Sequence, residues 1–202
     1  WAMSNNNAVF LTAQQDMDVE DPGFKDLYAY GVVAEVKQVL RVSDELVKVL
    51  VEGKYRAKLL TLDSSGRFLL ASTKAAALRG TKSVDSARVE ALVRSVKEAF
   101  EEYLSLNPRL SKDVVYTIIT NEDAALLCDY IPANLLLKYT DKQALLNEGT
   151  VSGRLEKLLE VLRRETKILH IEKDIQSKVN EQMDKNQRDY YLREQMRAIS
   201  NE

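Results

Sequence analysis

The chain has 202 residues, of which 45% are hydrophobic and 30% charged, enough apolar content for the core of one domain or of two small ones. Its 29 basic and 31 acidic residues give a net charge of -2, which creates no field that would gather nucleic acid or anionic lipid. Cys128 is the single cysteine, which excludes an internal disulfide framework and favours a reducing compartment, so we expect the cytoplasm.

The first part of the chain carries the period-two pattern of β-strands. Apolar and polar residues alternate over 32–42, with Gln38 as the one departure. A polar break at 43–45 separates this run from a second alternating run at 46–52. The pattern therefore predicts a β-hairpin whose second strand ends at Gly53.

Two further short strands are predicted at 55–62 and 67–72, on either side of a turn-forming cluster at 63–66. Segment 16–25 is acidic and contains a proline-glycine pair, so we expect an exposed loop there. Residues 1–80 are thus predicted to form a β-rich subdomain.

After Gly80 the apolar spacing changes to that of an α-helix. One stripe predicts a helix that stops before 107–108. The stripe consists of Val89, Leu92, Val93, Val96, Ala99, Phe100, Tyr103 and Leu104. The change of period places a domain boundary near Gly80 and begins a helical bundle at 81–153.

Capping residues indicate three shorter helices within this bundle. Ser111 and Asn121 are expected to be N-caps, because their side chains accept hydrogen bonds from free helical N–H groups. Thr140 and Gln143 have the spacing of a capping box.

Beyond Gly153 no helix breaker remains, so residues 154–202 are predicted to form one helix of roughly 74 Å. Its first part has a wide apolar face that suits packing on the bundle. Past His170 the apolar residues thin to about one per turn, so this part is expected to project into solvent. The wide face contains Leu155, Leu158, Leu159, Leu162 and Leu169, and the thin stripe Ile171, Ile175, Val179 and Met183.

The sequence carries no motif for nucleotide binding or covalent catalysis. Segment 80–83 resembles a phosphate-binding loop but lacks its first glycine and its adjacent lysine, so we interpret it as a loop. Cys128 is expected to be a small buried thiol, and His170 a surface or inter-helix residue of the long helix. We therefore predict no catalytic, cofactor-binding or metal-binding residue in this chain. No stretch approaches the roughly 18 to 20 apolar residues of a membrane-spanning helix.

The far end of the long helix carries apolar residues with no local core to fill. Two hypotheses account for them: packing against another part of a longer protein, or contact with unfolded polypeptide, which adaptable methionine and tyrosine side chains suit. The candidate substrate-binding residues are Met183, Asp184, Tyr190, Tyr191 and Met196.

Several segments resemble, in order, the N-terminal region of bacterial LonA-type ATP-dependent proteases. The resemblance covers most of the chain and is weak at 63–85 and 107–121; the segment at 187–199, QRDYYLREQMRAI, carries it most specifically. The others lie at 9–15, 20–22, 26–28, 31–34, 47–53, 56–57, 136–138, 141–143 and 171–173.

This resemblance implies an α+β fold: a β-rich PUA-like pseudo-barrel lacking its first strands, then an α-helical bundle ending in a long projecting helix. A missing strand would leave an unpaired sheet edge. Residues 1–4 are interpreted as the end of a preceding helix or a cloning remnant.

The resemblance also implies a non-catalytic region that engages unfolded, damaged or degron-bearing proteins and supports a hexamer. The Walker motifs, the Ser-Lys peptidase dyad and the bound ATP and Mg²⁺ would lie beyond residue 202. One alternative is a stand-alone helical scaffold or coiled coil, although sustained heptads are missing after Leu169. Another is RNA binding by the PUA-like part, which is disfavoured because residues 1–80 hold equal numbers of acidic and basic residues and so predict no basic face.

Overall fold

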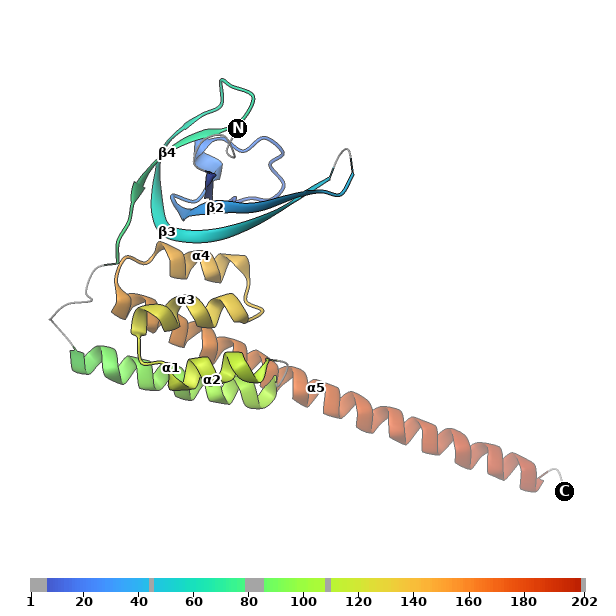
Figure 1. Ribbon diagram of the computed structural model, residues 1–202. Coiled ribbons are helices and arrows are strands. Elements are labelled where there is room, and N and C mark those ends of the chain that lie inside the picture. Colours follow the sequence, from blue (N-terminus) through green and yellow to red (C-terminus); the bar gives the residue numbers. More distant parts are fainter. Residues whose placement is uncertain (1–6, 44–45, 79–85, 108–109, 201–202) are drawn as a thin grey trace.

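The chain forms a curved antiparallel sheet followed by a helical bundle, in a computed structural model that describes residues 7–43, 46–78, 86–107 and 110–200 (Figure 1). The strands pair in the order β1-β2-β3-β4, and the α+β prediction is confirmed. The predicted boundary near Gly80 and residues 1–4 lie outside the described residues. The strands are β1 (Ala8–Leu11), β2 (Tyr30–Arg41), β3 (Val47–Asp63) and β4 (Leu70–Ala75). The α-helices are α1 (Ser86–Leu106), α2 (Lys112–Thr120), α3 (Ala124–Asn134), α4 (Tyr139–Asn147) and α5 (Val151–Ser200).

The predicted β2–β3 hairpin is present, but its second strand does not end at Gly53. Strand β3 runs through this residue to Asp63, because Gly53 pairs with Ala34 and Lys54 forms a bulge. A bulge bends a strand without ending it, so the two short strands predicted at 46–52 and 55–62 are one.

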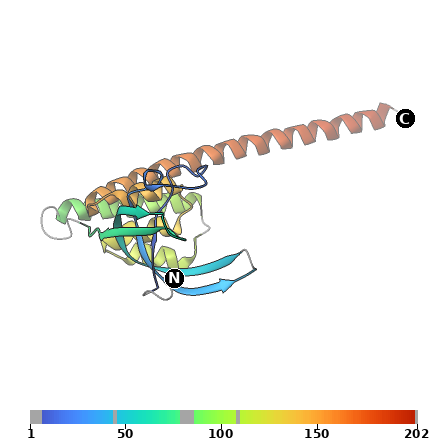
Figure 2. The same cartoon turned by 90° about the horizontal axis from the view of Figure 1, so that it is seen from above.

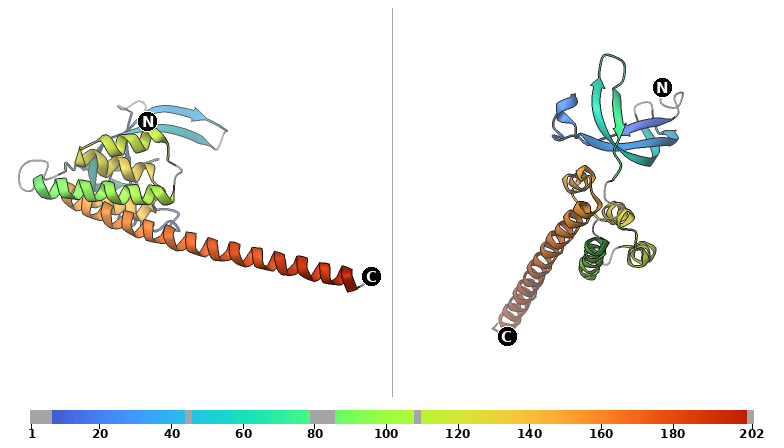
Figure 3. Two further views of the ribbon diagram at one scale, coloured as in Figure 1. Left: turned by 90° about the horizontal axis from the view of Figure 1, so that it is seen from below. Right: turned by 90° about the vertical axis from the view of Figure 1, so that its left-hand side faces the viewer.

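A second bulge changes the face that β2 presents. Val36 pairs with Val51 and Gln38 pairs with Leu50, which leaves Lys37 as the extra residue. Ala34 and Val36 are buried before the bulge, whereas the residues after it are exposed. The paired ends of β2 and β3 also extend beyond the bundle (Figure 3), so the single apolar face predicted for 32–42 does not continue to its end.

Other predictions in the sheet half hold in outline. Strand β4 starts at Leu70, three residues later than predicted. Segment 16–25 is mostly exposed and contains no strand, and the short 3-10 helix η2 (Phe24–Asp26) follows its proline. The predicted loop is therefore confirmed.

The main core lies where α1 packs along the first half of α5. Phe100 and Val96 of α1 are fully buried, as are Leu155, Leu158 and Leu162 of α5. Each such side chain stabilises the fold by about 1.5–3 kcal/mol through removal from water. The predicted stripe of α1 and the wide face of α5 are both confirmed.

Of the two predicted N-caps, one is confirmed and one is wrong. Ser111 caps α2, because its Oγ accepts a hydrogen bond from the Val114 N–H at 3.4 Å. Asn121 ends that helix as its C-cap, and Asp123 caps α3 by accepting from the Ala125 N–H at 2.9 Å. Asp123, two residues beyond Asn121, therefore provides the N-cap that was predicted for Asn121.

The predicted capping box at Thr140 is absent, because α4 already begins at Tyr139. Gln143 is buried, and its side-chain amide donates hydrogen bonds to the Tyr30 carbonyl oxygen and to Asn147 Oδ1, both at 2.8 Å. This residue therefore joins α4 to β2 instead of capping its own helix.

Candidate functional site

Helix α5 is continuous over 50 residues, about 75 Å, and only its first part touches the rest of the molecule (Figures 1 and 2). Leu155, Leu158 and Leu162 anchor the first part, and Leu169 packs partly against the same core. The residues beyond His170 whose side chains are described are all exposed. The predicted projecting helix is confirmed, although it begins at Val151.

The first turn of α5 is fixed by a polar cluster. Glu148 Oε1 accepts hydrogen bonds from the Gly149 N–H at 2.9 Å and from the Thr150 N–H and hydroxyl at 3.1 and 3.0 Å. Partial burial opposes ionisation, but these hydrogen bonds and the Lys157 ammonium together hold the pKa of Glu148 below its usual range. Buried Arg154 donates from Nε to the Leu145 carbonyl at 3.1 Å. The start of the projecting helix is therefore tied to α4.

The structure places all five predicted site residues on the projecting half of α5. Four have exposed apolar or aromatic side chains: Met183 63%, Tyr190 69%, Tyr191 63% and Met196 71%. Met183 and Tyr190 share a face because they are seven residues apart, and so do Asp184 and Tyr191. Met196 lies on a different face.

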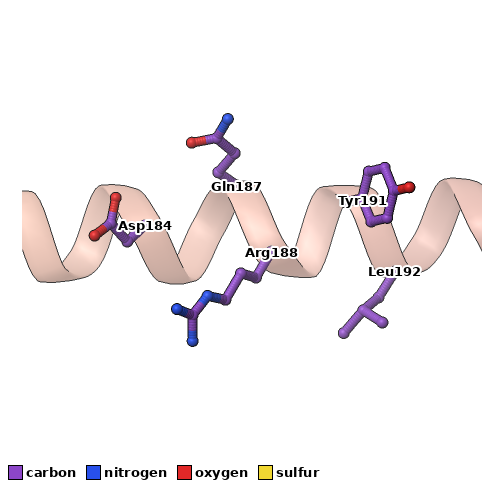
Figure 4. A pocket seen from close by; sticks show the side chains of 5 residues that line it. All are labelled: Asp184, Gln187, Arg188, Tyr191 and Leu192. Carbon is purple, nitrogen blue, oxygen red and sulfur yellow. The ribbon is translucent and has the colours of Figure 1, made fainter.

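A shallow hollow on this surface is lined by two of the predicted residues, Asp184 and Tyr191 (Figure 4). Gln187, Arg188 and Leu192 complete it and were not predicted, although Arg188 and Leu192 follow Asp184 at helical spacings of four and eight. Met183, Tyr190 and Met196 do not line it. All five lining residues belong to one helix, so the hollow suits contact along a polypeptide better than enclosure of a small molecule.

The apolar stripe that leads to this hollow does not form a coiled-coil seam. Its members are spaced four residues apart, which turns the stripe by about 40° around the helix at each step. Each of these side chains is at least 46% exposed, and a continuous row of exposed apolar side chains is typical of a binding surface. The stripe consists of Ile171, Ile175, Val179 and Met183.

The only thiol and the only imidazole of the chain serve packing and surface contacts. Cys128 is buried in the core, as predicted, and burial raises the pKa of its thiol to about 12, so it stays protonated at neutral pH. His170 Nε2 lies 3.7 Å from Glu102 Oε1 on α1, also as predicted. Within the described ranges, no three His, Cys, Asp or Glu side chains gather as metal ligands do.

The concave side of the sheet holds an apolar hollow of about 690 Å³ between β1 and β4. Phe10 and Leu11 line it from β1, and Phe68 and Leu70 line it from the opposite side. In the described sheet, β1 and β4 are the edge strands. Sequence periodicity gave no signal for this hollow, because it depends on how far the sheet curls.

No described helix is both long enough and apolar enough to cross a membrane.

Residues 2–164 match the family described as the ATP-dependent protease La (LON) substrate-binding domain. The chain is 39% identical over 201 residues to the Lon protease of Escherichia coli strain K12, covering all of this chain and 25% of that protein. It is 36% identical over 204 residues to the Lon protease of Clostridioides difficile strain 630, with 26% of that protein covered. A solved structure, the N terminal domain of Mycobacterium avium complex Lon protease, shares the fold with a TM-score of 0.56 at 18% identity; the match covers 77% of this chain and 90% of that one.

Proposed function

The chain belongs to the family of Lon substrate-binding domains, and we propose that it binds unfolded, damaged or degron-bearing proteins on behalf of a longer ATP-dependent protease. It spans about a quarter of the length of the relatives it matches, 25% of the Escherichia coli protein. ATP hydrolysis with Mg²⁺ and peptide-bond cleavage therefore belong, in this proposal, to the rest of the protease. The cytoplasm is its proposed location.

The exposed surface of α5 beyond His170 is the observation that carries this proposal. Met183, Tyr190 and Tyr191 are more than 60% exposed on the half of α5 that no other described element covers. Exposed apolar side chains cost solubility, so they persist where a partner covers them for part of the time. Methionine and tyrosine adapt to many partners, as binding of diverse unfolded chains requires.

The same helix supports a second part of the proposal, which is assembly. The part of α5 beyond His170, about 45 Å long, extends beyond the bundle (Figure 2), and its exposed apolar side chains lie on more than one face of the helix. Neighbouring copies in a hexamer can cover one side of this part while a client covers another. Client binding and self-association then use different faces of one helix.

Site-specific photocrosslinking tests client binding directly. A photoreactive phenylalanine analogue is placed at Met183 or Tyr190, and reduced casein serves as the unfolded client. Two exposed positions on the packed half of the same helix, Glu160 and Arg163, are the matched controls. We expect client crosslinks at the first two positions in severalfold higher yield than at the controls.

Equal yields at all four positions would refute client binding by this surface. Crosslinks that join two copies of the chain, unchanged by added client, would assign the surface to assembly alone. A folded client of similar size should give only background yields, because it exposes no extended apolar segment.

A further inference from the structure

Two lysines face each other directly across the β3–β4 ladder. Lys58 pairs in register with Lys74, so both side chains leave the same face of the sheet, where like charges repel. Tyr30 of β2 pairs with Lys58 from the other side, and Arg56 precedes it by two residues on the same face. Arg56 Cζ lies 4.5 Å and Lys58 Nζ 5.9 Å from the centre of the Tyr30 ring.

Elsewhere in the same sheet a like-charged pair is fully compensated. Glu35 and Glu52 are register partners on β2 and β3. Lys37 and Lys54 each contact both carboxylates, at 2.9 to 3.0 Å. By contrast, no carboxylate of a described residue forms an ion pair with any of the three cations around Tyr30. The sheet therefore neutralises one like-charged pair and leaves the other exposed to an incoming anion.

Arg56 is held in place before any ligand arrives. Its Nη1 donates to the Glu148 carbonyl oxygen at 2.7 Å, and its guanidinium stacks on Tyr30. Its Nε is buried without a hydrogen-bond partner. The guanidinium is therefore already partly removed from water in the folded protein, so a ligand that binds it has less water to displace. The Glu148 carboxylate offers no neutralisation, because Thr150 and Lys157 engage its two oxygens.

These cations line a hollow of about 530 Å³ between the sheet and the loop that joins α4 to α5. A neighbouring hollow of about 300 Å³ shares Arg56 and residues 75–77 with it and adds the apolar side chains of Tyr55, Leu78 and Leu146. Figure 1 shows the chain leaving β4 and running down toward the bundle beside this junction. A cationic hollow and a largely apolar one are thus contiguous.

We propose that this junction hollow, formed by Tyr30, Arg56, Lys58 and Lys74, binds an acidic segment of a client polypeptide. Neighbouring carboxylates enter the cationic hollow, and an adjacent apolar side chain enters the second one. A ligand that fits both must carry both groups on one chain, which a peptide does and an inorganic phosphate does not. The site rests on the proposed function, because it takes polypeptide clients as its ligands.

This cluster corrects the expectation that residues 1–80 offer no basic face. The acidic and basic residues are equal in number, but half of the acids lie in the segment 16–26 and none forms an ion pair with Arg56, Lys58 or Lys74 within the described residues. Their uneven placement in three dimensions leaves a local excess of positive charge that composition does not reveal.

Fluorescence anisotropy with a labelled peptide tests the site. The probe carries three consecutive aspartates beside two leucines, and a matched peptide carries asparagines instead. The double variant Lys58→Gln/Lys74→Gln should raise the Kd for the acidic probe about tenfold or more, and added salt should weaken binding to the unaltered protein. The matched control, Lys25→Gln/Lys48→Gln, removes two exposed lysines elsewhere and should change the Kd less than twofold.

A stability measurement separates binding from a structural role. If the lysines only supported the fold, their removal would lower the melting temperature. We expect it to stay equal or rise, because the substitution relieves repulsion between Lys58 and Lys74. Lys58→Arg/Lys74→Arg should retain binding.

Three results would overturn the assignment: equal Kd values for the lysine variant and its control, equal binding of the asparagine peptide, or tighter binding of tripolyphosphate or of an RNA oligonucleotide than of the acidic probe. Crosslinking at Met183 and Tyr190 is scored separately in the Lys58→Gln/Lys74→Gln variant and should persist. Failure of the junction site and failure of the α5 surface are thus distinguishable.

Discussion

Shortening a leucine in the packed half of α5 should lower stability, whereas shortening one in the projecting half should lower client binding and leave stability nearly unchanged. Leu158 is fully buried against the bundle, whereas Leu192 is 56% exposed on the projecting half. The variants Leu158→Ala and Leu192→Ala remove the same atoms from the same helix. Any difference between them therefore reports what each leucine contacts.

The buried substitution removes apolar contacts and leaves a cavity, which together cost about 2–5 kcal/mol of the free energy of unfolding. For a chain of this size, about 3 kcal/mol corresponds to a melting temperature lower by about 6–12 °C. The exposed substitution leaves no cavity, and alanine favours the helix slightly, so the change should stay within about 0.5 kcal/mol. Leu192 lines the hollow of Figure 4, so its loss should lower client crosslinking from a photoreactive analogue placed at Tyr191, which lines the same hollow.

Urea denaturation followed by far-ultraviolet circular dichroism measures the first effect, and crosslinking yield measures the second. Similar losses of stability in the two variants would refute the division of α5 into a packed and a projecting half. Unchanged crosslinking in Leu192→Ala would instead show that clients do not use this hollow.

Three further substitutions or measurements test the fold. Gln143→Leu should lower the free energy of unfolding by about 1–3 kcal/mol in urea titrations, because it removes the hydrogen bonds that the buried amide donates to the Tyr30 carbonyl and to Asn147. Gly31→Ala should lower the free energy of unfolding by about 1–3 kcal/mol, since the new Cβ would lie 2.2 Å from a backbone oxygen of β1. Gly53→Ala should lower it by less in the same assay, because its Cβ would meet only a side chain at 3.3 Å. Cys128 should react with a thiol reagent at pH 8 only when urea unfolds the protein, and fast labelling of the folded chain would contradict its burial. The folded state keeps this thiol proton up to a pKa of about 12 and the unfolded state loses it near 9.0, so the Cys128 contribution to stability should fall as the pH rises between these values.

The helices were predictable because their apolar stripes are long and periodic. The stripe of α1 repeats over five turns, and the wide face of α5 ends where its side chains become exposed. Caps were harder, since neighbouring polar residues compete for the same N–H groups, as Asn121 and Asp123 do.

The strands were less predictable because three bulges interrupt the sheet. Lys37, Lys54 and Leu60 are each the extra residue on one strand of a pair. Each bulge shifts the alternation by one, so apolar spacing no longer identifies a single buried face. The departure noted at Gln38 was the one signal of this in the sequence.

The two candidate sites also differ in how far the sequence could predict them. The α5 surface lies on one continuous segment, so its residues could be found from spacing alone. The junction hollow joins Tyr30, Arg56, Lys58 and Lys74 from three strands, and only the strand register brings them together. Its cationic character also depends on how far the acidic side chains lie from it in the fold, which a sequence does not show.

The sheet and the projecting helix are held together by few polar contacts. Among the described residues, hydrogen bonds join the sheet half to α4 and to the loop after it. Gln143 donates to the Tyr30 carbonyl, and Arg56 donates to the Glu148 carbonyl three residues before α5 begins. The junction hollow and the start of α5 therefore share one anchor.

This shared anchor sets a length requirement on clients. Met183 lies 32 residues beyond Val151, about 48 Å along the helix at about 1.5 Å per residue. An extended chain covers about 3.4 Å per residue, so at least about 14 residues must separate an acidic segment in the junction hollow from an apolar segment on the distal helix. In a longer client that carries both segments, binding of the first segment makes binding of the second an intramolecular step. The affinity of such a client should exceed that of either segment alone. A client with a shorter spacing can engage only one surface at a time, so the dependence of affinity on spacing distinguishes joint use from independent use.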